Sequence, residues 1–138
     1  MSAEMSADMY QDHILEHYEN PYNRMTLEQP TLELRDLNPL CGDEVRIQAC
    51  LDKHGHLAKV GFDGKGCIIS LAAASMLMEA VEGKTLEEVK KMDRQEMLAL
   101  LGVPLTTMRV KCAMLALRTL QKAIHLYEGQ QGAGAAHG

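Results

Sequence analysis

The spacing of apolar residues changes from period two to helical spacing near the middle of the chain. In the first half, residues 31–37 and 44–51 alternate between apolar and polar, which is typical of strands with one buried face. The apolar face of the second stretch consists of Val45, Ile47, Ala49 and Leu51. A turn around His54 and Gly55 leads into a third stretch, 56–62. These three strands are predicted to form an antiparallel meander.

Helical patterns lie on both sides of this predicted sheet. The clearest begins at Cys67, is rich in Ala, Leu and Met, and stops at Gly83. Thr85 and Asp93 are each followed three residues later by a glutamate, which is the capping-box signature of a helix start. Five helices are expected, over residues 8–18, 67–81, 85–91, 93–101 and 111–127.

Neither an internal repeat nor a linker divides the chain. We therefore expect one α+β domain over residues 1–138, with a small antiparallel three-stranded sheet packed against about five helices. The glycine-rich tail, residues 129–138, is expected to be disordered.

Composition narrows the classes of protein that fit this pattern. Four cysteines in 138 residues are too few for a disulfide scaffold, and the first residues lack a secretory signal, so reduced thiols and a cytoplasmic location are expected. The longest apolar run, 67–81, contains Glu79 and is too short to span a membrane. A formal net charge of −5 argues against nucleic-acid binding and favours protein partners or small ions. Ten methionines, one phenylalanine and no tryptophan predict an aliphatic core.

Three of the cysteines occupy junctions between predicted elements. Cys41 precedes a strand in a loop with proline and glycine, Cys67 begins a helix, and Cys112 is placed in the first turn of the last predicted helix. Helix starts favour the thiolate over the thiol, and thiolates bind metals or act as nucleophiles. If the sheet and helices pack face to face, these loops and helix starts converge at one edge, where Asp43 would supply a fourth ligand.

Three thiolates and a carboxylate suit a tetrahedral Zn²⁺ site, and the same thiolates could hold an iron-sulfur cluster. An oxygen ligand is harder than sulfur and, we infer, more readily displaced. Three cationic side chains that flank the proposed ligands in sequence could offset the excess negative charge: Lys65, Arg109 and Lys111.

The spacing of these cysteines does not by itself distinguish a metal site from ordinary buried thiols, because cysteines are often buried and no CxxC signature is present. Cys50 has no ligand-like neighbour and is expected to be an ordinary thiol. Four histidines are expected to have solvated or packing roles rather than to bind metal: His13, His17, His54 and His56. The glycines before Cys67 lack the P-loop pattern and predict a tight strand-to-helix turn.

Taken together, three segments in this order resemble the IscU/SufU-type iron-sulfur cluster assembly scaffolds: NPLCGDE at 38–44, GKGCIIS at 64–70 and RVKCAMLAL at 109–117. The likeness extends over nearly the whole chain and implies a SufE/IscU-like fold. It also implies that Cys41, Asp43, Cys67 and Cys112 are the zinc or cluster ligands.

The sequence departs from the pattern of the scaffold members at two places, and both bear on whether it is closer to the scaffold branch or to the SufU branch of the family. Lys111 precedes the third cysteine, where scaffold members usually have histidine, and a protonated lysine cannot bind metal. Residues 105–109 read LTTMR in place of the segment that an Hsp70-type chaperone recognises in scaffold members. Lysine at this position resembles the SufU branch, but the chain lacks that branch's extra stretch between Cys67 and Cys112.

The resemblance implies a scaffold that takes sulfur from a cysteine desulfurase, builds a transient [2Fe-2S]-type cluster and passes it to apo-proteins. Zinc could occupy the same ligands at rest. The alternative is a zinc-dependent sulfurtransferase, in which Cys112 or Cys41, assisted by Lys111, accepts persulfide sulfur. A purely structural zinc is a third alternative. The resting metal, the recipient proteins and any association of subunits stay open.

Overall fold

The computed structural model describes residues 12–39 and 42–137, with side chains described through Gln131. Three strands form an antiparallel sheet in the order β1-β2-β3. Their bounds are β1 (Leu32–Asn38), β2 (Asp43–Leu51) and β3 (Leu57–Lys65). The predicted three-stranded meander is confirmed.

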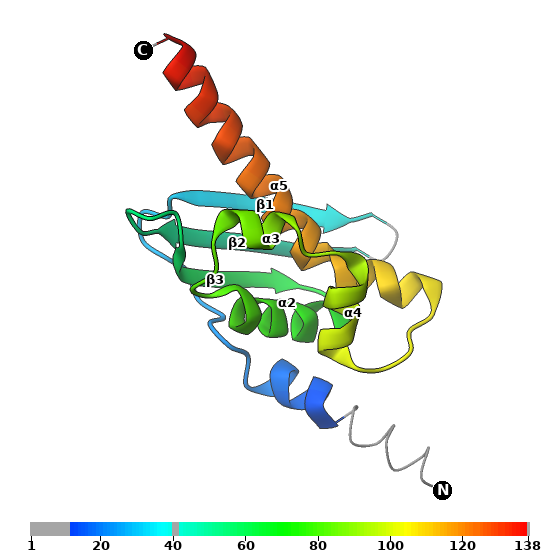
Figure 1. Ribbon diagram of the computed structural model, residues 1–138. Coiled ribbons are helices and arrows are strands. Elements are labelled where there is room, and N and C mark those ends of the chain that lie inside the picture. Colours follow the sequence, from blue (N-terminus) through cyan, green and yellow to red (C-terminus); the bar gives the residue numbers. More distant parts are fainter. Residues whose placement is uncertain (1–11, 40–41, 138) are drawn as a thin grey trace, which may run out of the picture.

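Helices cover one face of this sheet (Figure 1). A helix over residues 12–19 comes first in the described part of the chain. The others are α2 (Ile68–Val81), α3 (Leu86–Lys90), α4 (Arg94–Leu101) and α5 (Thr107–His137). The described part of the chain thus has the α+β architecture that the sequence predicts, with five helices beside the sheet. No helix among the described residues has the length and apolar character needed to cross a membrane.

The core lies between the sheet and the two long helices. Helix α5 packs against β1 and β2, while α2 packs against β3 and α5. Side chains of the sheet's inner face are fully buried against those of the helices. Examples from both layers are Ile47, Val60, Phe62, Leu77, Leu117 and Leu120. Burying each of these side chains contributes roughly 1.5–3 kcal/mol, which explains why tertiary packing fixes the sheet against the helices.

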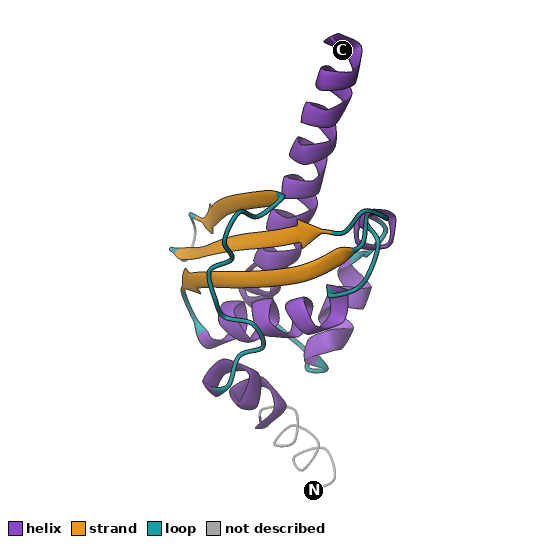
Figure 2. Cartoon of the chain, turned by 90° about the vertical axis from the view of Figure 1, so that its left-hand side faces the viewer, coloured by secondary structure: helices purple, strands orange, loops and turns teal. Residues whose placement is uncertain are grey.

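The segment that joins the first helix to β1 crosses the other face of the sheet (Figure 2). The Met25 N–H donates to the Phe62 carbonyl at 3.0 Å, and the Leu27 N–H donates to the Gln48 side-chain oxygen at 2.8 Å. This segment covers only part of that face. The remainder, toward the end of the sheet where β2 begins, carries charged side chains from all three strands.

Helix α5 differs from its predicted bounds at both ends. It begins at Thr107 rather than near Lys111, because the Thr106 hydroxyl accepts the Arg109 N–H at 3.3 Å and so caps an earlier start. It continues to His137, ten residues past the predicted end at Tyr127. Extending an existing helix needs no new nucleation, so the helix continues past Gly129 into an alanine-containing tail.

The first helix is attached to α2 through a buried serine. Ser75 is fully buried; its hydroxyl lies 2.8 Å from His17 Nδ1 and accepts the Tyr22 N–H at 2.7 Å. Burial, and then the neighbouring His13, lowers the pKa of His17 below its ordinary value. The folded chain therefore favours the neutral form of the His17 side chain over the protonated form.

We predict that acid weakens this attachment. The unfolded chain has a histidine pKa of about 6.5 and binds a proton before the folded chain does, so the free energy of unfolding falls as pH drops below that value. Urea unfolding at pH 7.5 and pH 5.5 measures the change. His17→Gln should reduce this pH dependence, whereas substitution of the exposed His125 by Gln should not; equal slopes in all three proteins would contradict the assignment.

Candidate metal site

Asp43 is the first residue of β2 and faces the helices. Strand alternation places it on the same face as the buried Val45 and Ile47, and it is only 2% exposed. The turn before it brings the chain back from β1, because the Gly42 N–H donates to the Asn38 carbonyl at 2.8 Å and Gly42 has φ of +72°. Cys41, the first of the predicted ligands, directly precedes Gly42 in sequence and lies outside the described residues.

Cys67 is the N-cap of α2. Its Sγ atom accepts a hydrogen bond from the Ser70 N–H at 3.5 Å, and its own backbone N–H donates to Asp43 Oδ1 at 3.0 Å. The sequence predicted this cysteine at a helix start, and the structure confirms it. Both the N–H groups and the helix dipole at this position favour negative charge on the ligand atoms.

Gly66 allows β3 and α2 to meet close to Asp43. A Cβ atom at this position would lie 2.6 Å from Asp43 Oδ1, closer than a side chain can approach a fixed oxygen. The glycines before Cys67 therefore serve a tight strand-to-helix turn, as predicted, and bring the thiol beside the carboxylate.

Cys112 comes to the same place from α5. Because α5 begins at Thr107, Cys112 lies in its second turn, and the predicted first-turn position is wrong. The side chain is 2% exposed and faces α2 and the sheet rather than solvent. Its place near Asp43 and Cys67 comes from helix packing and not from the end of a helix.

These residues form a compact donor set. One ligand atom from each of Asp43, Cys67 and Cys112 lies within 4.8 Å of the others, and no other group of three such side chains is found in the described part of the chain. Cys67 Sγ and Asp43 Oδ2 are 3.5 Å apart, close to the spacing of about 3.5 Å between adjacent ligands of a tetrahedral zinc ion. Two thiolates and a carboxylate this close would repel one another without a cation between them, so the donor set fits a metal ion.

Ser70 connects all three residues and was missed as a site residue by the sequence analysis. Its hydroxyl donates a very short hydrogen bond to Asp43 Oδ2 and lies 3.6 Å from Cys67 Sγ and 3.4 Å from the Cys112 carbonyl oxygen. It is 6% exposed. A hydroxyl three residues after the capping cysteine, in a helix that is otherwise almost entirely apolar, is the signal that could have identified it.

The three cations that flank the ligands in sequence point in different directions. Arg109 lines a cavity of about 380 Å³ together with Asp43, Cys67 and Cys112. Lys111 lines a separate cavity beside β1, and Lys65 lies on the outer face of the sheet. Among the described residues, Arg109 is therefore the cationic side chain that shares the site's cavity.

The site opens into an apolar groove. Cys67 and Arg109 also line a cavity of about 610 Å³ whose other walls come from the first helix, the start of α2 and the loop before α5. Two of its apolar residues are partly exposed to solvent, Leu15 at 39% and Ile68 at 41%. The groove gives a partner access to Cys67 from one side.

Comparison with known proteins agrees with this arrangement. The family model of the NifU-like N-terminal domain matches residues 9–133. The chain belongs to the NifU-like N-terminal domain family. It is 33% identical to the zinc-dependent sulfurtransferase SufU of Bacillus subtilis, over 88% of this chain and 92% of that protein. It is 30% identical to the iron-sulfur cluster assembly scaffold protein IscU of Haemophilus influenzae, over 89% of this chain and 98% of that protein.

Solved structures of the family have the same fold. FiSufU from the thermophile Fervidobacterium islandicum AW-1 superposes with a TM-score of 0.70 at 26% identity, over 81% of this chain and 93% of that one. The N-terminal part of a nitrogen-fixing NifU-like protein from Brucella abortus superposes with a TM-score of 0.71 at 18% identity, which shows the fold alone. The IscU/SufU-type resemblance seen in the sequence is confirmed.

The other cysteine and histidines lie away from the candidate site of this NifU-like chain. Cys50 is half-buried on β2, near the far end of the sheet. His54 and His56 lie at the turn between β2 and β3, where His56 Nδ1 is 3.5 Å from Asp52 Oδ1. None of the three belongs to the donor set found among the described residues.

Ser70 should control how firmly Asp43 is oriented toward a bound ion. Groups that hydrogen-bond to metal ligands typically change metal affinity by 10–100-fold when they are removed. We predict that Ser70→Ala lowers zinc affinity by roughly tenfold or more, measured by competition with a chelating dye. Ser75→Ala is the matched control, because it removes another buried, hydrogen-bonded hydroxyl of α2 outside the site. Equal zinc affinity in both variants would contradict this role of Ser70.

Proposed function

We propose that this chain is an iron-sulfur cluster assembly scaffold. It receives sulfur from a cysteine desulfurase, builds a [2Fe-2S]-type cluster on Cys41, Asp43, Cys67 and Cys112, and passes the cluster to apo-proteins. The observation that carries the proposal is the donor set of Asp43, Cys67 and Cys112 within 4.8 Å, in a member of a family that contains IscU scaffolds.

Cys41 is the fourth ligand in this proposal. The hydrogen bond from the Gly42 N–H to the Asn38 carbonyl closes the turn that leads to Asp43. In sequence, Cys41 comes three residues after Asn38 and two residues before Asp43. This closeness to Asp43 in sequence supports Cys41 as the fourth ligand. Cluster irons are commonly held by four protein ligands, which the described residues alone do not supply.

The combination of thiolate ligands with one carboxylate ligand suits a cluster that is later transferred to a recipient protein. Thiolates bind iron and zinc strongly, whereas the harder carboxylate oxygen is the weaker partner for these borderline and soft centres. Asp43 is also engaged by the Cys67 N–H and the Ser70 hydroxyl, which compete with the metal for its lone pairs. Asp43 is thus the ligand that an incoming thiolate of a recipient protein displaces most easily.

Sulfur transfer requires a thiolate with access to the partner. In the proposed step a thiolate of this chain attacks the terminal sulfur of the desulfurase persulfide, a new S–S bond forms, and the desulfurase leaves as a thiolate. Cys67 is half-buried beside the groove, whereas Cys112 is 2% exposed. Among the described cysteines of the site, Cys67 is therefore better placed than Cys112 for the first attack, and Cys41 remains an alternative acceptor. Reduction of the transferred sulfur to sulfide needs two electrons per sulfur from an external reductant.

A second candidate function has specific support. Identity to the SufU sulfurtransferase of Bacillus subtilis is 33%, and Lys111 replaces the histidine found in scaffold members. In that function zinc stays bound, one thiolate is released to accept persulfide sulfur, and no cluster forms. The four proposed ligands, which are the donor set and Cys41, fit zinc as well as iron, because three thiolates and one oxygen complete a tetrahedral site.

Anaerobic reconstitution with ferrous iron, cysteine, a desulfurase and a reductant tests the scaffold proposal. Visible absorption of a cluster should develop on the chain, and Cys67→Ser or Cys112→Ser should lose most of it. Cys50→Ser is the matched control and should behave like the unchanged chain. Failure to form a cluster, combined with strong stimulation of desulfurase turnover by the zinc-loaded chain, would favour the sulfurtransferase instead.

The apolar groove should contribute to desulfurase binding. Ile68 is 41% exposed and adjoins Cys67, so Ile68→Asp places a charge where a partner would bury apolar surface. We predict at least a fivefold loss of affinity for the desulfurase, measured by isothermal titration, because this substitution costs on the order of 1 kcal/mol or more. Zinc affinity should not change.

Leu126→Asp is the control for this experiment. Leu126 is 53% exposed on α5 and is not among the residues that line the groove. If both aspartate variants bind the desulfurase equally well, the groove is not its binding surface.

A further inference from the structure

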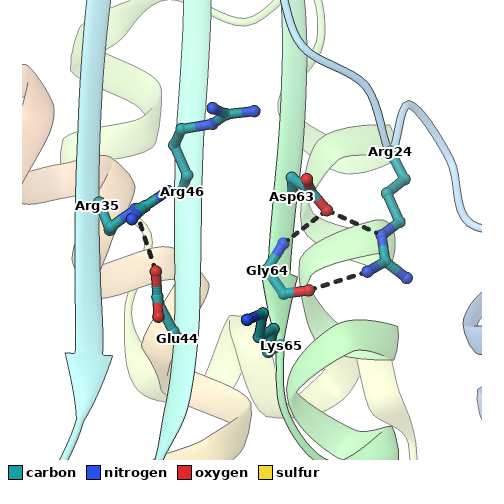
Figure 3. Close-up of a pocket in the computed structure, with 7 residues that line it drawn as sticks. All are labelled: Arg24, Arg35, Glu44, Arg46, Asp63, Gly64 and Lys65. Carbon is teal, nitrogen blue, oxygen red and sulfur yellow. Dashed lines mark hydrogen bonds and ion pairs between the residues drawn. The ribbon is translucent and has the colours of Figure 1, made fainter.

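A basic pocket lies on the face of the sheet opposite the helices (Figure 3). Six charged side chains from three strands and the crossing segment line a cavity of about 270 Å³: Arg24, Arg35, Glu44, Arg46, Asp63 and Lys65. Four are cationic and two are anionic, which leaves two excess positive charges in a chain of formal net charge −5. This concentration of positive charge is not explained by the proposed function.

Two of the four cations are neutralised by neighbours. Arg35 Nε lies 3.1 Å from Glu44 Oε1, and Arg24 Nε lies 3.2 Å from Asp63 Oδ1. A hydrogen bond from the Gly64 N–H, together with Arg24, lowers the pKa of Asp63, so this carboxylate stays ionised.

The other two cations, Arg46 and Lys65, have no ion pair within the described ranges. Lys65 lies across from Glu44 in the sheet, but the Glu44 carboxylate is paired with Arg35.

The strand register places two arginines opposite each other. Arg35 on β1 is the direct cross-strand partner of Arg46 on β2. Like charges at directly opposed positions destabilise a sheet. Asp63 on β3 is the cross-strand partner of Arg46 on its other side, but its carboxylate is paired with Arg24, so an added anion beside the two guanidinium groups would lower the remaining repulsion.

Arg46 also carries an unsatisfied donor. Its Nη2 group donates to Thr26 Oγ1 at 2.6 Å, but its Nε–H is shielded from solvent and has no hydrogen-bond partner. It is the one such buried side-chain nitrogen or oxygen in the described part of the chain. A shielded N–H without an acceptor costs free energy, and an arginine fork is well suited to bind an oxyanion through two donors.

We propose that this pocket binds a small oxyanion, a free molecule carrying a phosphate or carboxylate group, through Arg46 and Lys65. The acids Glu44 and Asp63 are the cross-strand neighbours of Lys65 and Arg46, so they would repel a long acidic segment more than a compact anion that contacts the two cations. Glu44 directly follows Asp43, and Lys65 lies two residues before Cys67. The anion would therefore bind close to the candidate metal site, on the other face of the sheet, without occupying it.

NMR titrations of the metal-free full chain with inorganic phosphate and, separately, with citrate test the proposal at constant ionic strength. We expect saturable shifts at the Arg46 Nε–H and at the backbone amides of residues 35, 46 and 65. Loss of a charged hydrogen bond should weaken binding about tenfold or more in Arg46→Gln. The phosphate and citrate arms show which oxyanion is preferred.

Lys65→Gln is a second variant at an exposed side chain, and it should also weaken binding. Lys53→Gln removes an exposed lysine at the β2–β3 turn and should bind like the unchanged chain. Non-saturating shifts, or equal binding by all variants, would overturn the proposal. Binding of a glutamate-rich peptide without binding of phosphate or citrate would also overturn it, in favour of an acidic protein partner.

Discussion

The structure depends most on how the start of α2 holds the Asp43 carboxylate. The Cys67 N–H and the Ser70 hydroxyl donate to its two oxygens, and Gly66 allows this approach. A carboxylate that is 2% exposed must be hydrogen-bonded or paired to remain buried. The same contacts that satisfy the carboxylate bring the Cys67 thiol to 3.5 Å from it. The same hydrogen bonds therefore stabilise the junction between the sheet and α2 and bring the donor set together.

Strand alternation in β2 gives the two faces of the sheet different roles. Asp43, Val45 and Ile47 point toward the helices, so the first of them meets Cys67 and Cys112 at the edge of the core. Glu44 and Arg46 point the other way and contribute to the basic pocket. Because the side chains alternate with a period of two, adjacent residues line two separate cavities, and a shift of register by one residue would exchange them.

Local patterns in the sequence were sufficient for the fold, because alternation in β2 and the caps at Cys67, Thr85 and Asp93 each act over a few residues. Asp43 and Cys67 were also predictable from their junctions. The features that the sequence did not predict depend on residues that are distant in sequence, or on a helix cap that the pattern did not reveal. Thr106 moved the start of α5, and Ser70 gained its role only because Asp43 and Cys112 reach it from other elements. Only the three-dimensional packing shows that Arg109 lines the cavity of the candidate site and that Lys111 lines a different one.

X-ray absorption at the zinc edge, on the zinc-loaded chain, tests most directly whether Cys41, Asp43, Cys67 and Cys112 share one ion. The account predicts a first coordination shell of three sulfurs at about 2.3 Å and one oxygen at about 2.0–2.2 Å. Asp43→Ala should keep the three sulfurs and change only the light-atom ligand, either to water or to none. A shell made of nitrogen and oxygen alone, or one with fewer than three sulfurs in the unchanged chain, would contradict the shared site.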